Sequence, residues 1–197
     1  MEYTLKNKNG LTAGFLDLGA VWHSMLVPDR EGKFADVVLG YDSPEHYLAS
    51  DAHLGEIIGR NANRIGGGRF ELNGREYALT VNNGPNNLHS GNDFYRNRLW
   101  EARAWEEAGE SSVCFTLESP DGDQGFPGNL KISVTYTLND QDELHIRYQG
   151  VSDADTIMNM TNHAYFNLAG HQSGDAMGQQ VYLNADQFTP ADEVSIP

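Results

Sequence analysis

The stretch LKISVTYTLNDQDELHIRY, residues 130–148, decides the fold class of this 197-residue chain. Apolar side chains occupy every second position of residues 130–138 and again of residues 144–148, and polar or smaller side chains fill most positions between them. A period of two is typical of a β-strand with one buried face and one solvated face. The polar residues 139–143 separate the two runs, so the stretch predicts two antiparallel strands joined by a turn.

Shorter runs of the same kind lie on the N-terminal side of this stretch. Residues 113–117 alternate in the same way, and residues 70–79 predict a hairpin with Asn73-Gly74 at its tip, because both turn positions tolerate a positive φ. Residues 17–27 and 37–39 are predicted to form further short strands. Many short strands with regular turn signals predict an all-β protein, a large antiparallel β-sandwich.

Helical periodicity is nearly absent from the chain. Residues 43–48 predict one short helix, with Ser43 as its N-cap and Pro44 in its first turn, the positions that these residue types prefer. No internal repeat or interdomain linker interrupts the chain, so residues 1–197 are expected to belong to a single domain.

The charge of the chain bears on its partners. It carries 28 acidic and 13 basic residues, a formal net charge of -15. Binding to nucleic acid or to an anionic membrane requires clustered Lys and Arg. We therefore expect neither partner, and the acidity itself is explained by solubility.

Cysteine usage and the N-terminal sequence indicate a compartment. The single cysteine, Cys114, cannot form an internal disulfide, and a lone thiol fits a reducing environment. The first ten residues lack the apolar segment of a secretory signal, and no stretch approaches the roughly 20 apolar residues that span a membrane. These features predict a cytoplasmic protein.

Residues 59–70, GRNANRIGGGRF, combine three arginines with two asparagines. The planar guanidinium of arginine suits vicinal sugar hydroxyls as well as carboxylates, and asparagine both donates and accepts hydrogen bonds. The glycines do not have the spacing of a phosphate-binding loop. A turn rich in surface arginines is the simpler interpretation of this segment alone.

Two histidines lie in polar motifs, His89 at the end of residues 81–91 and His163 within residues 159–168. Histidine exchanges protons near neutral pH, so the pair indicates proton transfer on a polar, uncharged ligand. The alternative for His89 is an ordinary surface histidine, and the alternative for His163 is a core histidine whose hydrogen bonds are satisfied within the sandwich. Metal binding by His89, His163 and His171 is conceivable, but no known ligand spacing supports it, and no metal is predicted.

Residues 119–128, SPDGDQGFPG, invite comparison with a calcium loop. They lack the alternating acidic ligands and the distal glutamate of such a loop. A compact surface turn is predicted instead.

Taken together, four motifs resemble the aldose 1-epimerase family, also called the galactose mutarotases. They are residues 59–65, 82–89, 119–128 and 161–168, in family order, and the resemblance extends to Phe188-Thr189-Pro190. It implies a large antiparallel β-sandwich of the galactose mutarotase type. It also implies interconversion of the α and β anomers of free aldohexoses such as galactose and glucose, without any cofactor.

The resemblance assigns roles to individual residues. His163 would be the general acid that protonates the ring oxygen of the sugar, and His89 would contact and polarise the same oxygen. Asn63 and Arg64 would bind sugar hydroxyls, and Tyr165 and Asn167 would line the same site. The partner is thus a small neutral sugar, and the oligomeric state is left open.

Two features depart from the family pattern. Ser90 stands where the family usually has glycine. The family also continues past the position of Pro197, in a part that carries a general base and a sugar-binding carboxylate, so the chain is expected to be an incomplete, C-terminally truncated domain. We expect residues 1–197 alone to catalyse little above the spontaneous rate and to associate through unpaired strand edges.

Two other functions compete with this interpretation. The first is a related epimerase acting on a hexose 6-phosphate, for which Arg60, Arg64 and Arg69 could supply positive charge. The second is a non-catalytic carbohydrate-binding module.

Overall fold

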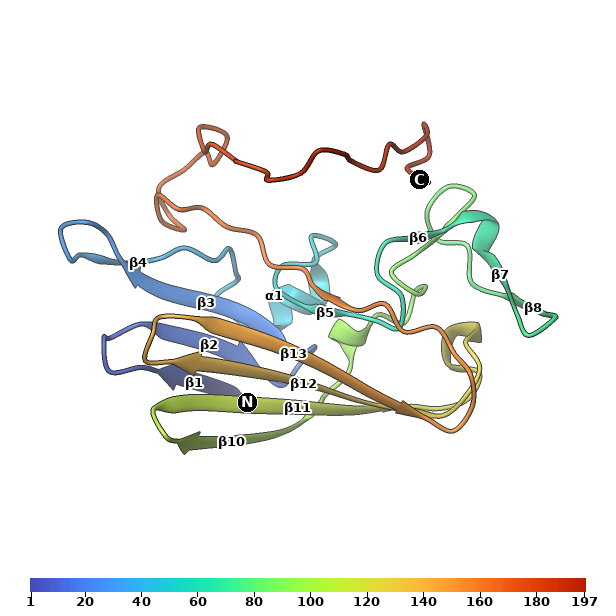
Figure 1. Ribbon diagram of the computed structural model, residues 1–197, viewed down its shortest axis with the longest axis horizontal. Helices are drawn as coiled ribbons and strands as arrows, with labels where there is room; N and C mark the ends of the chain where they lie inside the picture. Colours follow the sequence, from blue (N-terminus) through green and yellow to red (C-terminus); the bar gives the residue numbers. More distant parts are fainter.

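A computed structural model describes all residues from 1 to 197 and contains two four-stranded antiparallel sheets packed against each other (Figure 1). The strand orders are β1-β2-β3-β4 and β10-β11-β12-β13. The bounds of the first sheet are Glu2–Lys6 (β1), Thr12–Leu16 (β2), Val21–Pro28 (β3) and Phe34–Asp36 (β4). Those of the second are Glu101–Glu107 (β10), Glu110–Ser119 (β11), Leu130–Asn139 (β12) and Leu144–Ser152 (β13).

The hairpin predicted at residues 130–148 is confirmed as β12 and β13. Its innermost paired residues are Leu138 and Leu144. The alternating apolar residues of β12 are all buried, with at most 2% of each exposed: Leu130, Ile132, Val134, Tyr136 and Leu138. The prediction of an antiparallel β-sandwich is therefore confirmed.

Aromatic side chains from both sheets form the centre of the core. Phe15 on β2 lies 4.4 Å from the ring of Tyr136 on β12 and 6.5 Å from that of Phe115 on β11. Tyr3 on β1 meets Phe115 edge-on at 5.7 Å. Burying an aromatic side chain contributes about 1.5–3 kcal/mol, so these contacts hold the two sheets together.

The first sheet differs from its prediction. Strands β1 and β2 were not predicted, and residues 17–20 of the predicted strand 17–27 form a turn before β3. The strand predicted at residues 37–39 is absent, because β4 ends at Asp36 and only Val38 makes an isolated bridge, to Phe166. Consecutive residues of β2 are buried on both faces. A strand buried on both faces has no period of two to detect.

The predicted helix is present as α1, Pro44–Ala49, with Pro44 in its first turn. Ser43 occupies the N-cap position, but its side chain makes no capping hydrogen bond. The predicted N-cap position of Ser43 is therefore confirmed, although its hydroxyl takes no part in the capping. The buried Tyr47 ties the helix to the body, because its hydroxyl accepts a hydrogen bond from the backbone N–H of Tyr41 (2.9 Å).

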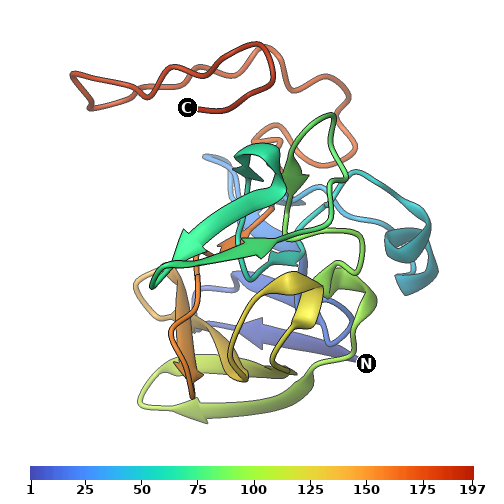
Figure 2. The same ribbon diagram turned by 90° about the vertical axis from the view of Figure 1, so that its right-hand side faces the viewer.

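Three small two-stranded sheets lie beside the sandwich (Figure 2). They pair β5 (Ile57–Ile58) with β14 (Thr161–Asn162), β6 (Arg64–Ile65) with β9 (Asn87–Leu88), and β7 (Arg69–Leu72) with β8 (Arg75–Ala78). Three 3-10 turns span Gly66–Gly68, Tyr95–Asn97 and Asp123–Gly125. The β7–β8 pair is the predicted hairpin, with Asn73 and Gly74 at φ 54° and 74°.

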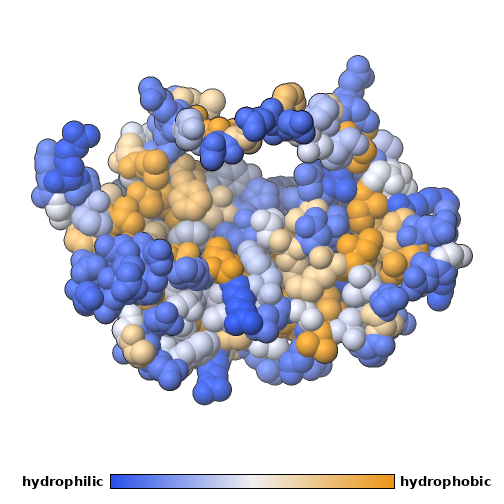
Figure 3. Space-filling model, in the orientation of Figure 1, coloured by the Kyte–Doolittle hydropathy of each residue, from blue (hydrophilic) through white to orange (hydrophobic).

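After Asn167 the chain continues as an extended segment with no helix or strand. It crosses above the body of the molecule (Figure 1), and the space-filling view shows the surface hollowed beneath it (Figure 3). None of the helices is both long and apolar enough to cross a membrane.

Candidate active site

A cavity of about 420 Å³ opens between the small sheets. It is lined by Ala62, Asn63, Arg64, Leu88, His89, Thr161 and His163. Four residues singled out in the sequence, namely Asn63, Arg64, His89 and His163, therefore meet at one cavity although they lie up to 100 residues apart in the chain.

The pairing of β5 with β14 places His163. Its backbone N–H donates to the Glu56 carbonyl (2.9 Å), and its carbonyl accepts from the Gly55 N–H (3.0 Å). Gly55 adopts a φ of 65°, and a Cβ there would collide with the carbonyl oxygen of Trp22. Only glycine therefore allows this chain crossing, which holds His163 against the segment that carries Glu56.

The pairing of β6 with β9 places His89 opposite Asn63. The His89 N–H donates to the Asn63 carbonyl (3.0 Å), and the Asn63 N–H donates to Nδ1 of the His89 ring (3.0 Å). Both residues have left-handed backbones, with φ of 53° and 65°. Such strain in non-glycine residues persists where the surroundings over-determine the conformation, often at functional sites.

This hydrogen bond defines the chemical state of His89. Because Nδ1 accepts a proton from the backbone, the neutral ring carries its own hydrogen on Nε2. Burial, followed by the charges of His53, His163 and Arg64, lowers the pKa of His89 from 6.5 to about 4. At neutral pH His89 is thus an uncharged hydrogen-bond donor.

The serine that departs from the family pattern supports this loop. Ser90 is fully buried, and its hydroxyl accepts from the Asn61 N–H (2.8 Å) and donates to the Asn61 carbonyl (3.1 Å). The side chain at position 90 is therefore accommodated by a polar contact, and His89 keeps its place at the cavity.

Three imidazole rings form a cluster, two of them at the cavity and the third behind them. Those of His89 and His163 have centroids 5.4 Å apart and stand nearly perpendicular. The ring of His53 lies 5.0 Å from that of His89 and 5.6 Å from that of His163. His53 was not predicted as a site residue, because it lies in no recognised motif and the segment 51–56 has no periodicity.

Arg64 is the charged group at the cavity wall. Its Nε donates to the side-chain oxygen of Asn83 (2.9 Å) and its Nη1 to that of Asn63 (3.2 Å). These two bonds orient the guanidinium and leave other N–H groups without protein acceptors. The arrangement can bind hydroxyl oxygens.

Of the two remaining predicted site residues, Tyr165 lies beside the cavity and Asn167 does not. The exposed ring of Tyr165 lies 5.1 Å from that of His163, beside the cavity. Asn167 is 1% exposed, and its amide donates to Ser173 and Gly174 within the following turn. The structure therefore does not bring the Asn167 side chain to the cavity, because these bonds hold it in that turn.

Two of the three arginines of residues 59–70 also lie elsewhere. Arg60 is 1% exposed and binds the loop at residues 119–128, so the interpretation as a turn of surface arginines is wrong for this residue. Arg69 is exposed and pairs with Glu76 on the β7–β8 hairpin (2.9 Å). Positive charge at the cavity therefore comes from Arg64 alone among the three.

The residues considered for metal and calcium binding do not come together in one site. His171 lies against Asp36, with its Nδ1 3.8 Å from Oδ2, and does not line the cavity. In the loop at residues 119–128, Asp123 forms an ion pair with Arg98 (2.7 Å) and turns its carboxylate inward. No group of three His, Cys, Asp or Glu side chains is arranged to hold a metal ion.

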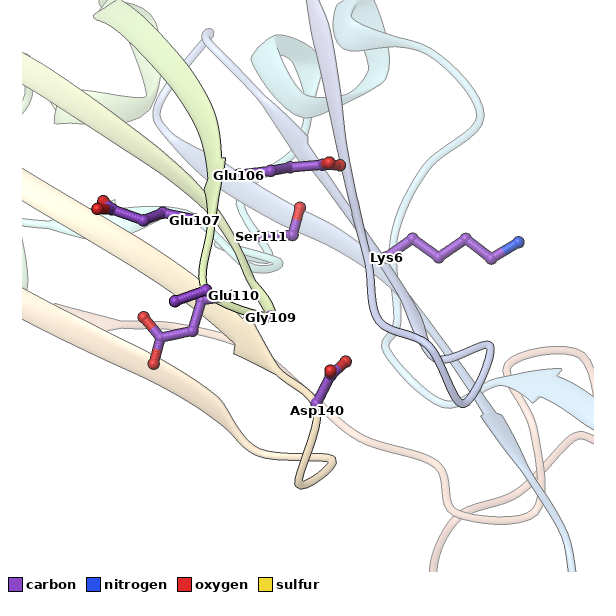
Figure 4. Close-up of a pocket in the computed structure, with 8 residues that line it drawn as sticks. Lys6, Glu106, Glu107, Gly109, Glu110, Ser111 and Asp140 are labelled. Carbon is purple, nitrogen blue, oxygen red and sulfur yellow. The ribbon is translucent and has the colours of Figure 1, made fainter.

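A second hollow, of about 270 Å³, lies at the far end of the sandwich (Figure 4). Its lining includes Glu106, Glu107, Glu110, Asp140 and Lys6, and the Lys6 side chain points away from the four acidic residues (Figure 4). It contains none of the predicted site residues. Its carboxylates belong to the solvated ends of hairpins, which explains their clustering.

The structure defines the class of this protein. It is an antiparallel β-sandwich of the galactose mutarotase type, with a histidine-lined polar cavity at the small sheets. A GalM/aldose epimerase homologue from C. elegans superposes with a TM-score of 0.78 at 39% identity, covering 85% of this chain and 51% of its own. A galactose 1-epimerase from Lactobacillus acidophilus gives 0.77 at 34% identity, covering 85% and 48%.

The sequence profile of the aldose 1-epimerase family matches residues 1–197, and the chain belongs to that family. It is 44% identical to an aldose 1-epimerase of Haemophilus influenzae, over 98% of this chain and 56% of the relative. It is 43% identical to a galactose mutarotase of Bos taurus, over 95% and 53%. The chain thus spans about half the length of the curated relatives it matches, and the family resemblance seen in the sequence is confirmed.

Proposed function

We propose that this chain carries the histidine-bearing part of an aldose 1-epimerase site, which interconverts the α and β anomers of free aldohexoses such as galactose and glucose. One observation carries the proposal. The rings of His89 and His163 lie 5.4 Å apart at a cavity that Asn63 and Arg64 also line. The family to which the chain belongs supports the same assignment.

The reaction breaks the bond between C1 and the ring oxygen. A base removes the proton of the anomeric hydroxyl, C1 becomes an aldehyde, and the electron pair of the broken bond stays on the ring oxygen, which takes a proton. Rotation about the C1–C2 bond and the reverse steps then give the other anomer. We assign His163 as the general acid for the ring oxygen, a role that contributes about 10²–10⁴-fold to the rate.

His89 has a different part. Its neutral ring donates from Nε2, so it can polarise the ring oxygen without transferring a full charge to the site. Arg64 and Asn63 bind sugar hydroxyls, and Tyr165 offers an aromatic surface beside His163. We propose no sugar contact for Asn167, since its amide is buried in hydrogen bonds of the following turn.

None of the residues that line the cavity is a carboxylate. The chain also spans only 56% of the Haemophilus influenzae relative. We therefore assign the base that receives the anomeric proton to no residue of this chain.

The cavity favours a neutral sugar over a hexose phosphate. A phosphate dianion needs several cationic groups, and Arg60 and Arg69 are occupied away from the cavity. The free, half-buried thiol of Cys114 fits a reducing compartment, and on that ground we propose a cytoplasmic location.

Polarimetry tests the proposal. Residues 1–197 are joined to the remaining part of the Haemophilus influenzae relative, and the loss of optical rotation of fresh α-galactose is followed against an enzyme-free blank. We expect a rate well above the blank, and a much lower rate with a hexose 6-phosphate.

Three outcomes separate the competing functions. A higher rate on the hexose 6-phosphate identifies the phosphosugar enzyme. Galactose binding without catalysis by the folded chimaera identifies a binding module. Neither binding nor catalysis contradicts the proposed function.

A further inference from the structure

The third imidazole of the cluster, that of His53, is anchored by a carboxylate, which the other two lack. Its Nδ1 lies 2.5 Å from Oε1 of Glu56, whose side chain is 3% exposed. A carboxylate accepts hydrogen bonds, so His53 donates its Nδ1 hydrogen, and the opposite nitrogen of the neutral ring is left with a lone pair. A histidine oriented by a buried carboxylate is the arrangement by which proteins fix an imidazole in one tautomer and one orientation.

A buried arginine stands behind this pair. Nη1 of Arg96 lies 3.9 Å from Oε2 of Glu56, and its Nη2 lies 3.3 Å from the exposed Asp51. The guanidinium also stacks on the ring of Phe94 at 4.8 Å. A buried carboxylate costs several kcal/mol unless it is paired, and His53 and Arg96 both compensate Glu56, one at each oxygen.

The ring of His53 contacts the site on one face and the protein interior on another. It lies 5.0 Å from His89, 5.6 Å from His163 and 5.0 Å from Phe94, and its side chain is only 15% exposed. His53 does not line the cavity, so it acts on a ligand through its two neighbours. Its backbone φ of 57° is left-handed, a strained conformation that the surrounding contacts must maintain.

The backbone makes this arrangement rigid. His163 is hydrogen-bonded at its N–H and at its carbonyl to Glu56 and Gly55. The anchor of the His53 ring and the backbone of the proposed acid therefore belong to one hydrogen-bonded unit. Movement of the His163 backbone relative to that of Glu56 would require these bonds to break.

We propose that His53 is a positioning residue of the site: held by Glu56, its ring fixes the imidazoles of His89 and His163 in their mutual orientation. The role of this residue in catalysis rests on the proposed function, but the contacts among the three imidazole rings do not depend on the substrate. The charged and titratable groups around the cluster are Glu56, Asp51, Arg96, Arg64 and Tyr165.

Position and charge have separate consequences. Electrostatic repulsion from the His53 imidazole is the second cause, after burial, of the lowered pKa of His89. Removing the imidazole at position 53 also leaves the Glu56 carboxylate with Arg96, at 3.9 Å, as its remaining compensating group. Both changes favour protonation of His89.

The experiment is nitrogen NMR of the 197-residue chain labelled at its histidines. His53→Phe keeps an aromatic ring but removes the donor and the charge, and His53→Asn keeps a donor to Glu56 but removes the ring. His145→Asn on β13 is the matched control, because His145 is exposed and its ring contacts Glu143 outside the cluster.

We expect wild-type His89 to remain the neutral Nε2–H form from pH 8 down to pH 5. In His53→Phe it should keep this tautomer but take up a proton at a pH nearer the ordinary midpoint of about 6.5. In His53→Asn the two neutral tautomers of His89 should mix, since the supporting ring is lost. The control should leave the His89 signals unchanged.

The wild-type spectrum supplies a test that needs no variant. His53 should show an Nδ1 proton protected from exchange at neutral pH, and its absence would overturn the inference. Folded His53 variants with wild-type His89 and His163 signals would also overturn it. If the predicted NMR changes occur in a protein whose chimaera neither binds nor converts galactose, the proposed function fails and the positioning role stands.

Discussion

Arg60 and Arg64 stand four residues apart on one segment, and their guanidinium groups are used in opposite ways. Arg60 is almost fully buried and donates to carbonyls of Ser119, Pro120, Pro127 and Gly128 and to two hydroxyls. Arg64 has only two side-chain partners and lines the cavity. The first arginine is saturated by the protein, and the second keeps donors for a ligand.

The comparison shows that residue type and motif do not distinguish a structural arginine from a binding one. What distinguishes them is how many of the five donors the fold has already used. The Arg60 region should therefore respond to substitution in stability, and the cavity region should respond in binding and rate.

The largest effect is expected from Arg60→Ala. Six hydrogen bonds are lost, and buried carbonyls of the loop at residues 119–128 are left without donors. We expect the free energy of unfolding in urea to fall by about 3–5 kcal/mol. Arg69→Ala, at an exposed ion pair, is the control and should change it by less than about 1 kcal/mol; equal losses would contradict the structural role of Arg60.

The next effect is expected on the rate. His163→Asn in the chimaera should keep the fold and lower mutarotation of galactose by about 10²-fold or more, because one proton-transfer group is lost. Polarimetry measures the rate, and His145→Asn on the surface should leave it unchanged. A near-wild-type rate in folded His163→Asn would move the acid role to another residue.

A smaller effect is expected from Arg64→Ala. Its free donors face the cavity, so we expect the affinity for galactose to fall by about tenfold, measured by isothermal titration calorimetry. The free energy of unfolding should change by less than about 1 kcal/mol. A loss of stability like that of Arg60→Ala would remove the distinction between the two arginines.

The smallest effect concerns pH. The pKa of His89 is about 4 in the folded chain against 6.5 for an ordinary histidine, so the unfolded chain binds more protons between these values. Stability should therefore decrease as the pH falls through 6.5 toward 4, by less than about 1 kcal/mol over the first pH unit.

Urea denaturation at several pH values measures this dependence. His89→Gln should be less sensitive to pH in the same window, because the titrating ring is gone. An identical dependence in the variant would contradict the assignment of this decrease to the cavity.

The sequence predicted the second sheet better than the first for a physical reason. β12 has one buried face and one polar or part-buried face, so its pattern has a period of two. β2 is buried on both faces, and β5 and β14 are only two residues long and pair across about a hundred residues of chain. Neither case leaves a periodic signal in the sequence.

The site was predictable only in part, for related reasons. The motifs indicated His89 and His163, and the fold brings both to one cavity. The burial of Arg60 and of Asn167 depends on loops that fold back from later in the chain or from the following turn. The contacts of His53 depend on three separate segments meeting, which no local pattern records.

The hydrogen bond that holds the His89 ring comes from the main chain of Asn63. Its side chain is exposed and makes a separate contact with Arg64. For protein engineering, position 63 is therefore a place where ligand preference can be altered while the tautomer of the neighbouring imidazole is preserved. Few residue types are suitable for such a redesign, since a backbone φ of 65° is adopted chiefly by glycine, asparagine and aspartate.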